Sequence, residues 1–355
     1  MSITAVCLHL VALGLSFVAA AEPDSAAALN HLGTRYYAEG RHQESEQLFR
    51  KAVSIWEKEG QTHAADLGKA LGNLAAAVRA QSRLEEAEAL YRRSLAVLEQ
   101  ALGPRDPSIA ATLGNLAELC RASGSYAEAE SLYVRLLVLQ KDSQGTAGAA
   151  LAATLGNLGA LYQVQERYSD ARASYERALA AGGEEALDRD DPLVITILNN
   201  LGLLYKREGR YAEVEPLFRR CLDTWERTLG PEHPNVATTL VNLAELFVAL
   251  GKLHGAEKLY GRALSIRERA LDPRHQSLAD SMKGLANVYL AQGRQTEAIS
   301  LLKRVLAIEE EALGPDHPQL AVDLAGYARA LHLARRETEA SQAEARANAI
   351  MGRRK

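Results

Sequence analysis

Residues 199–234 read NNLGLLYKREGRYAEVEPLFRRCLDTWERTLGPEHP, and this stretch decides the fold. In it Leu201 is followed by a small residue, by Tyr205 four positions later, and by a Gly-Arg-Tyr segment. The same pattern recurs about every 42 residues, with one step of 43. We call the place of Leu201 the register position. Its equivalents are Leu32, Leu74, Leu116, Leu158, Leu243, Leu285 and Tyr327.

Each repeat begins with a segment that has helical periodicity. The residue after the register position is always Gly or Ala, and four residues after the register position stands a larger side chain, in most repeats an apolar one such as Tyr205 or Phe247. These three positions share one face of a helix. A glycine follows in five repeats and favours the left-handed turn that ends a helix. Ser82, Glu166 and Arg335 replace it in the other three, so we expect those turns to close differently.

A second helix follows each turn. Alanine, an aromatic residue and a further small residue recur on its inner face at helical spacing, as in Ala171, Tyr175 and Ala178. The loop to the next repeat has the form Gly-Pro-x-x-Pro, with Asp or His before the last proline. His233, His275 and His317 recur there, and we interpret them as helix caps rather than metal ligands. The loops at 142–146 and around Gly182-Gly183 lack this form and are expected to be the softest.

Together these patterns predict an all-α, right-handed superhelical solenoid of about eight antiparallel helix pairs. The array spans residues 22–351, with repeats near 25–60, 61–103, 104–145, 146–188, 189–230, 231–272, 273–314 and 315–351. The last second helix has Glu344 where earlier repeats have an aromatic residue, as suits a polar end cap. Residues 352–355 form a basic tail.

The small residue, the Gly-x-Tyr turn and the alanine–aromatic second helix resemble the tetratricopeptide repeat. The 42-residue unit with its Leu-Gly-Pro-x-His-Pro loop is similar to the kinesin-light-chain type. The resemblance covers residues 25 to about 345 and implies a non-catalytic protein that binds protein partners. It also implies that the first helices line a concave groove for a peptide. A coiled coil precedes the repeats in kinesin light chains, and a signal-like segment stands in its place here, so a motor-adaptor role is not expected.

The first 21 residues differ from the repeats. Residues 3–21 carry no charge, and Ala19-Ala20-Ala21 fits the small-residue pattern before a cleavage site. We therefore expect a signal peptide at residues 1–21, an exported protein, and no membrane insertion after cleavage. The alternatives are an uncleaved anchor or a frayed leader. Cys120 and Cys221 lie two repeats apart on apolar positions, which favours two buried thiols over a disulfide.

Asparagine precedes the register position in five repeats and is a candidate ligand for peptide main chain, because an amide both donates and accepts hydrogen bonds. The alternative is that these amides tie the helices of the array together. These asparagines are Asn73, Asn115, Asn157, Asn200 and Asn242.

Cations occupy the place five residues after the register position in three repeats: Arg79, Arg121 and Lys206. Such a row could hold acidic side chains or a C-terminal carboxylate. The alternative is an ordinary solvated face, in which Glu118 and Glu245 pair with the cations.

No phosphate-binding loop, metal-binding histidine pair or nucleophile motif is found, so no enzyme activity, cofactor or metal is expected. The formal net charge of −4 gives no sign of a nucleic-acid partner. The predicted function is a scaffold that binds a peptide segment of a protein partner in its groove. The alternative is a structural or assembly component that self-associates through the opposite face or the array ends.

Overall fold

The computed structural model describes residues 25–142, 147–188 and 191–352. Throughout these ranges the regular structure is helical, without strands, and it falls into two compact units, residues 1–142 and 143–355. The expected signal peptide, the loop at 143–146 and residues 353–355 of the tail lie outside the described residues. Among the described helices, none has the length and apolar character that crossing a membrane requires.

The first unit contains three helix pairs. Within it each helix packs on its pair partner, and each second helix packs on the first helix of the next pair. The first helices are α1 (Ala26–Ala38), α3 (Ala64–Ala80) and α5 (Ala110–Ala122); the second helices are α2 (His42–Glu59), α4 (Leu84–Leu102) and α6 (Tyr126–Asp142). Two 3₁₀ turns, η1 (Gly60–His63) and η2 (Pro107–Ile109), lie between the pairs.

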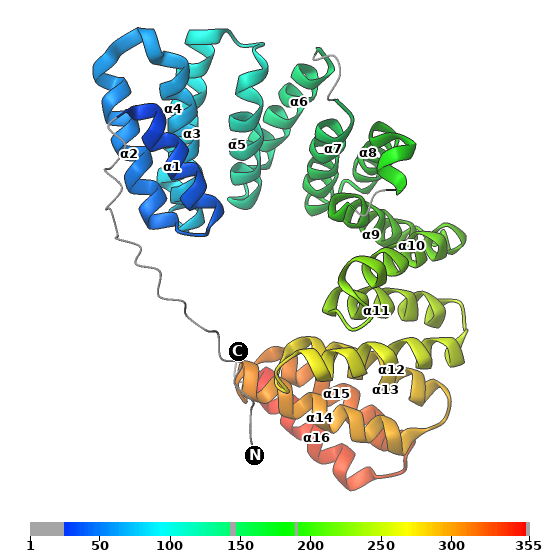
Figure 1. Cartoon of the computed structure of the whole chain (residues 1–355). Coiled ribbons are helices and arrows are strands. Elements are labelled where there is room, and N and C mark those ends of the chain that lie inside the picture. The colour runs from blue at the N-terminus through cyan, green and yellow to red at the C-terminus, as the bar shows by residue number, and fades with distance from the viewer. Residues whose placement is uncertain (1–24, 143–146, 189–190, 353–355) are drawn as a thin grey trace, which may run out of the picture. The chain divides into compact units, whose positions relative to one another are not determined.

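The second unit contains five helix pairs that stack in the same way, as Figure 1 shows. Its first helices are α7 (Ala147–Val164), α9 (Pro192–Arg207), α11 (Pro234–Ala249), α13 (Gln276–Ala291) and α15 (Pro318–Leu333). Its second helices are α8 (Tyr168–Asp188), α10 (Tyr211–Leu229), α12 (Leu253–Ala270), α14 (Gln295–Leu313) and α16 (Glu337–Gly352). The expected all-α solenoid of about eight helix pairs is therefore confirmed.

The small residue after the register position has a packing cause. In the fifth repeat a methyl group added at Gly202 would lie 2.6 Å from the ring of Phe218. Gly159 meets Tyr175 in the same way, at 2.6 Å. In these repeats the aromatic ring of the second helix thus lies directly against the backbone of the first helix. Close contact of this kind leaves little room for a larger side chain.

The three turns without glycine close like the others, so the expectation that they differ is wrong. Ser82, Glu166 and Arg335 all adopt left-handed backbone, with φ of 62°, 59° and 58°. The Arg83 N–H donates to the Val78 carbonyl at 3.3 Å, and Arg210 donates to Tyr205 at 2.9 Å in a turn with glycine. The packing of the two helices therefore imposes the turn geometry even on side chains that disfavour it.

An Asp or His at the start of the following helix acts as its cap in several interrepeat loops, as predicted. The His233 Nδ1 accepts a hydrogen bond from the Asn235 N–H at 3.2 Å, and Asp191 accepts one from Leu193 at 2.8 Å. His275 and His317 make the same bond. A cap satisfies one of the free N–H groups at a helix start, which accounts for the recurrence of histidine without any metal.

Two further expectations have opposite outcomes. The sequence predicted a loop around Gly182-Gly183. This prediction is wrong, because α8 continues through both glycines to Asp188. The two buried cysteines are unpaired, as predicted. Burial raises the pKa of the Cys120 thiol to about 11 and that of Cys221 to about 12, so both are unreactive packing residues.

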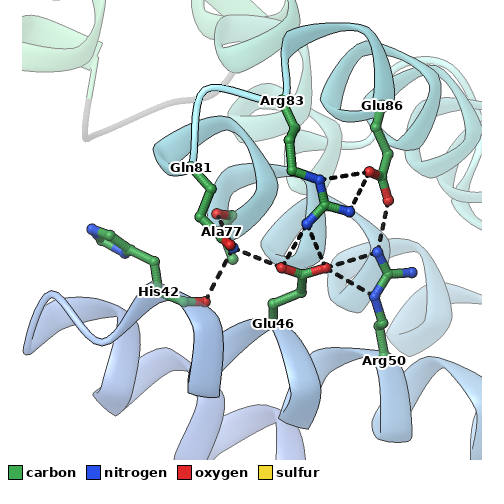
Figure 2. Close-up of polar contacts among 7 residues, drawn as sticks. All are labelled: His42, Glu46, Arg50, Ala77, Gln81, Arg83 and Glu86. Carbon is green, nitrogen blue, oxygen red and sulfur yellow. Dashed lines mark hydrogen bonds and ion pairs between the residues drawn. The ribbon is translucent and has the colours of Figure 1, made fainter.

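Consecutive second helices are joined by ion pairs. Figure 2 shows the most buried of these, in which the Glu46 carboxylate of α2 accepts hydrogen bonds from Arg50, Gln81 and Arg83 at 2.7–3.0 Å. A second series joins a glutamate to an arginine 36 residues later. It includes Glu57–Arg93 at 2.5 Å, Glu226–Arg262 at 2.6 Å, Glu268–Arg304 at 2.8 Å and Glu310–Arg346 at 2.6 Å. Many charged side chains of the second helices are therefore already paired with other side chains of the array.

Candidate functional site

In each of the two units, we call the first-helix face the surface formed by the residues one before, two after and five after the register position. Two of its asparagines bond to the preceding first helix. Asn73 of α3 donates to Asn30 Oδ1 of α1 at 3.1 Å, and Asn242 of α11 donates to Asn199 Oδ1 of α9 at 2.8 Å. In these two repeats the structure favours the interpretation that the amides tie the array together, which the sequence left open.

The other three asparagines lie in different surroundings. The Asn200 amide donates to the Tyr175 hydroxyl at 3.2 Å, and this hydroxyl lies 3.1 Å from the Gln163 Oε1. Asn115 is half-buried and Asn157 is exposed. Within the described residues neither makes a side-chain hydrogen bond, so these two amides are open to a ligand.

Two of the three cations pair with the glutamates that the sequence suggested. Arg121 donates to Glu118 at 2.9 Å, and Lys206 of α9 contacts Glu245 of α11 at 2.5 Å. Burial works to raise the pKa of Glu118, but the hydrogen bonds from Arg121 and Tyr133 outweigh it and hold the pKa below its usual range. Arg79 is half-buried and makes no ion pair in the described part of the chain. The charge of Arg79 nevertheless acts on Glu118 of the next repeat, where it adds to the lowering of the pKa by Arg121 and Tyr133.

In the eighth repeat the same position carries His332, which also pairs with glutamate side chains. His332 of α15 lies five residues after the eighth register position, with its ring nitrogens 3.0 Å from Glu344 and 2.7 Å from Glu337 of α16. The hydrogen bonds to Glu344 and Glu337 raise the pKa of His332. Glu344 thus replaces the usual aromatic residue with a polar contact in the last helix pair.

A cleft of about 570 Å³ opens on the first-helix face of the second unit. Three consecutive first helices contribute to it, with Gln163 from α7, Lys206 from α9 and Glu245 and Ala249 from α11. Its volume falls within the 300–1,000 Å³ that is usual for ligand pockets. The cleft brings together two of the positions in the predicted cation row.

Sequence reasoning missed several residues of this cleft, among them Tyr168, Arg207 and Tyr211. The Arg207 guanidinium stacks on the Tyr168 ring, 4.0 Å from its centroid, a contact that orients a cation and keeps it exposed. A signal was present, because Tyr168 and Tyr211 both stand ten residues after a register position. Among the described residues no group of His, Cys, Asp or Glu is arranged to hold a metal ion.

Comparison with known proteins agrees with this architecture. The tetratricopeptide repeat profile matches residues 24–100, 66–142, 108–182, 150–224, 193–269, 246–311 and 277–351. No curated protein matches the chain.

Solved structures show the same fold. BtubC (BKLC) from P. vanneervenii is 27% identical, with a TM-score of 0.57 over 65% of this chain and 92% of its own. A putative kinesin light chain from Podosopora anserina, with nearly identical repeats, is 26% identical, with a TM-score of 0.51 over 56% and 94%. A signal-transduction ATPase from Pyrococcus horikoshii with a tetratricopeptide repeat sensor has a TM-score of 0.67 over 92% and 48%. At 13% identity it shows the fold alone.

Proposed function

Because this chain belongs to the tetratricopeptide repeat family and its repeats are of the kinesin-light-chain type, we propose that it binds a peptide segment of a protein partner on its first-helix face. Proteins of this family are in general non-catalytic scaffolds for protein–protein interaction. For this chain we propose more specifically that the partner lies on the first-helix face and presents a peptide segment there.

The cleft on the second unit is the observation that carries this proposal. It draws side chains from three first helices, so a bound segment would run across successive repeats. Exposed Asn157 stands on the same row as Asn200 and offers both a donor and an acceptor to peptide main chain. The second helices give less support for a partner, because many of their charged groups already pair with one another.

The test is to fill the cleft without touching the core. Ala249 is exposed, lines the cleft and stands six residues after its register position. Peptides selected for binding to the wild-type protein from a displayed library should lose at least tenfold in affinity on Ala249→Trp. Ala291 is exposed at the same position one repeat later and does not line this cleft, so Ala291→Trp is the matched control.

Two outcomes would contradict the proposal. Either the selected peptides bind both tryptophan variants like the wild type, or they bind only an associated form of the protein. The second result would favour self-association. Light scattering on the same samples distinguishes the two.

We also propose that the chain is exported. The support is the uncharged stretch at residues 3–21 and its small residues before Glu22. The mass of the protein recovered from the extracytoplasmic fraction of its host should correspond to a chain beginning at Glu22. Recovery from the cytoplasm with an intact N-terminus would contradict export.

A further inference from the structure

The sixth repeat contains a buried arginine that has no acidic partner. Arg267 of α12 is 7% exposed and makes no ion pair within the described residues. Its guanidinium lies between α11 and α13 and donates to three oxygens, which are the Thr238 Oγ1 at 3.3 Å, the Ser277 carbonyl at 2.6 Å and the Ser281 Oγ at 2.8 Å. We call the space between the N-terminal halves of two consecutive first helices a crevice. In this crevice, neutral oxygen acceptors hold a guanidinium.

The same acceptors recur one repeat earlier, in the crevice between α9 and α11. Each acceptor of Arg267 has a counterpart 42 residues before it, and these counterparts are Thr196, Asn235 and Thr239. The counterpart of the arginine itself is Trp225 of α10. Hydroxyl residues at the places of Thr196 and Thr239 occur together in these two crevices and in no other pair of consecutive repeats. The crevice between α9 and α11 therefore has the acceptors without the donor.

The hydroxyl groups of this crevice are oriented like those that hold the arginine. Thr196 donates its hydroxyl hydrogen to the Pro192 carbonyl at 2.8 Å, and Thr239 donates to the Asn235 carbonyl at 3.1 Å. The corresponding hydroxyls of the next crevice make the same bonds within their own helices. Because each hydroxyl hydrogen is used inside its helix, the oxygen keeps a lone pair for a donor from outside.

An open pocket of about 310 Å³ occupies the crevice between α9 and α11. The three acceptor residues and Trp225 line it, and none of its lining residues is charged. Thr196 is exposed, and Asn235 and Trp225 are half-buried, so solvent reaches the pocket. Asn199 also lines it and accepts the hydrogen bond from Asn242 of the first-helix face. The pocket therefore borders the face on which we place the peptide.

We propose that this pocket, which we call the Trp225 pocket, binds the guanidinium of an arginine side chain of the bound peptide. The guanidinium donates to the Thr196 Oγ1, the Asn235 carbonyl and the Thr239 Oγ1, as Arg267 does to their counterparts. A planar fork of N–H groups suits several acceptors at once, whereas a lysine ammonium is a compact point charge. The inference rests on the proposed function and names one side chain of the peptide.

The indole ring of Trp225 has a definite part in this arrangement. Burial lowers the pKa of Arg267, and the charge of Asp280 acts in the opposite direction. The Trp225 pocket has Thr238 at the place of Asp280, so it lacks that charge. A tryptophan face attracts a cation without carrying a charge, and a guanidinium can stack on it. The ring thus supplies the attraction that Asp280 supplies to Arg267.

Three probe peptides test the pocket. They have the form N-acetyl-Ala-Ala-X-Ala-Ala-amide, where X is arginine, citrulline or lysine. Citrulline keeps the shape of arginine without its charge, and lysine keeps the charge without the planar fork. Affinities come from NMR titration of the ¹⁵N-labelled full chain, read at the indole N–H of Trp225. The arginine peptide should bind at least tenfold more tightly than the other two. It should leave the indole signal of Trp56, the other tryptophan of the chain, unchanged.

Four variants locate the recognition. Thr196→Val and Thr239→Val each remove one acceptor and should weaken the arginine peptide about tenfold, because a charged donor loses a partner. Trp225→Arg copies the sixth repeat, so the chain's own guanidinium should fill the pocket and abolish binding, with the circular dichroism unchanged. Thr154→Val is the matched control and should have no effect. Thr154 stands at the place of Thr239 in the fourth repeat, bonds to the Ala150 carbonyl at 3.0 Å and does not line the pocket.

Two results would overturn the Trp225 pocket. One is equal affinity for the three peptides or an unchanged Trp225 indole signal. The other is a preference for arginine that survives Thr196→Val, Thr239→Val and Trp225→Arg. Both leave the proposed peptide binding standing, since that is judged by Ala249→Trp on the selected peptides. If instead Ala249→Trp has no effect while the preference for arginine holds, the pocket stands and the proposed position of the peptide does not.

Discussion

At the scale of single residues, the molecule departs from its repeat pattern where packing overrides local preference. Ser82, Glu166 and Arg335 occupy left-handed backbone that glycine occupies in the other five turns. For an L-residue this conformation costs roughly 1–2 kcal/mol. The cost is tolerated because the helices on both sides are fixed by their cores.

Ser82→Gly should therefore stabilise the protein. The variant relieves the strain of the left-handed backbone. Glycine also gives the unfolded chain more conformational entropy, which lowers the free energy of unfolding by roughly 0.4–1 kcal/mol. The net gain is expected to be about 0.5–1 kcal/mol in the free energy of unfolding, measured by urea denaturation. Gly124→Ala, at the equivalent turn with φ of 82°, should lose a similar amount. A destabilised Ser82→Gly would show that the serine side chain contributes to the turn.

Some residues of the candidate site could be predicted from the sequence, and others could not. It predicted the histidine caps, and it gave Glu118 and Glu245 as partners of the cations in the alternative interpretation of the row, because each of these groups sits at a fixed repeat position. It could not decide the role of the asparagines, since the partner of Asn73 is fixed by how α1 and α3 pack. Nor could it predict that the hydroxyl of Tyr91, a buried residue of α4, has no hydrogen-bond partner among the described residues, because that depends on how the helices pack.

At the scale of elements, adjacent repeats are held together by apolar packing and by polar contacts between second helices. Glu46 is the most informative of these contacts, because its side chain is largely buried and has three donors (Figure 2). Burial works to raise the pKa of Glu46, but the bonds from Arg50, Gln81 and Arg83 outweigh it and lower the pKa. The equivalent Glu88 has Ser125 in the place of Arg83 and lacks this arrangement.

Glu46→Gln should destabilise the first unit by about 1–3 kcal/mol at pH 7, because it leaves buried donors facing a neutral amide. The pKa of Glu46 is lower in the folded than in the unfolded chain. Its stabilisation is therefore present above the unfolded pKa and is lost as pH falls through the folded pKa.

The difference in unfolding free energy between wild type and Glu46→Gln should accordingly shrink as pH falls below about 4.5, measured by denaturant titration at each pH. Glu88→Gln provides the matched control and should have a smaller effect at pH 7. A difference that stays constant from pH 7 to pH 3 would show that the charge of Glu46 is not what stabilises the contact.

At the scale of the whole molecule, a 42-residue pattern predicts a stack of helix pairs, because each pair buries its apolar faces against its neighbours. The register leucines, the aromatic rings and the small residues recur at this spacing, so the architecture could be predicted from the sequence. It was not sufficient for α8, whose continuation through Gly182 and Gly183 overrides the low helix propensity of glycine. Nor did it indicate that the chain divides into two compact units near residue 142.

The first unit should fold alone. Residues 25–142 contain three helix pairs with their own buried core, and about three repeats are the minimum for a stable array. A fragment of these residues should show helical circular dichroism and a single cooperative thermal transition. A fragment ending at residue 102, with two pairs, should be markedly less stable. Absence of helical structure in the three-pair fragment would show that this unit depends on the rest of the chain.

The central claim is that the partner binds the first helices rather than the second. Hydrogen–deuterium exchange of the full chain, with and without a selected peptide, tests this most directly. The account predicts slower amide exchange in α7, α9 and α11 around the cleft and at the starts of α8 and α10, where Tyr168 and Tyr211 line it. The rest of α8 and α10 and the whole of α12 should be unchanged. Protection confined to the second helices, or to the ends of the array, would contradict it.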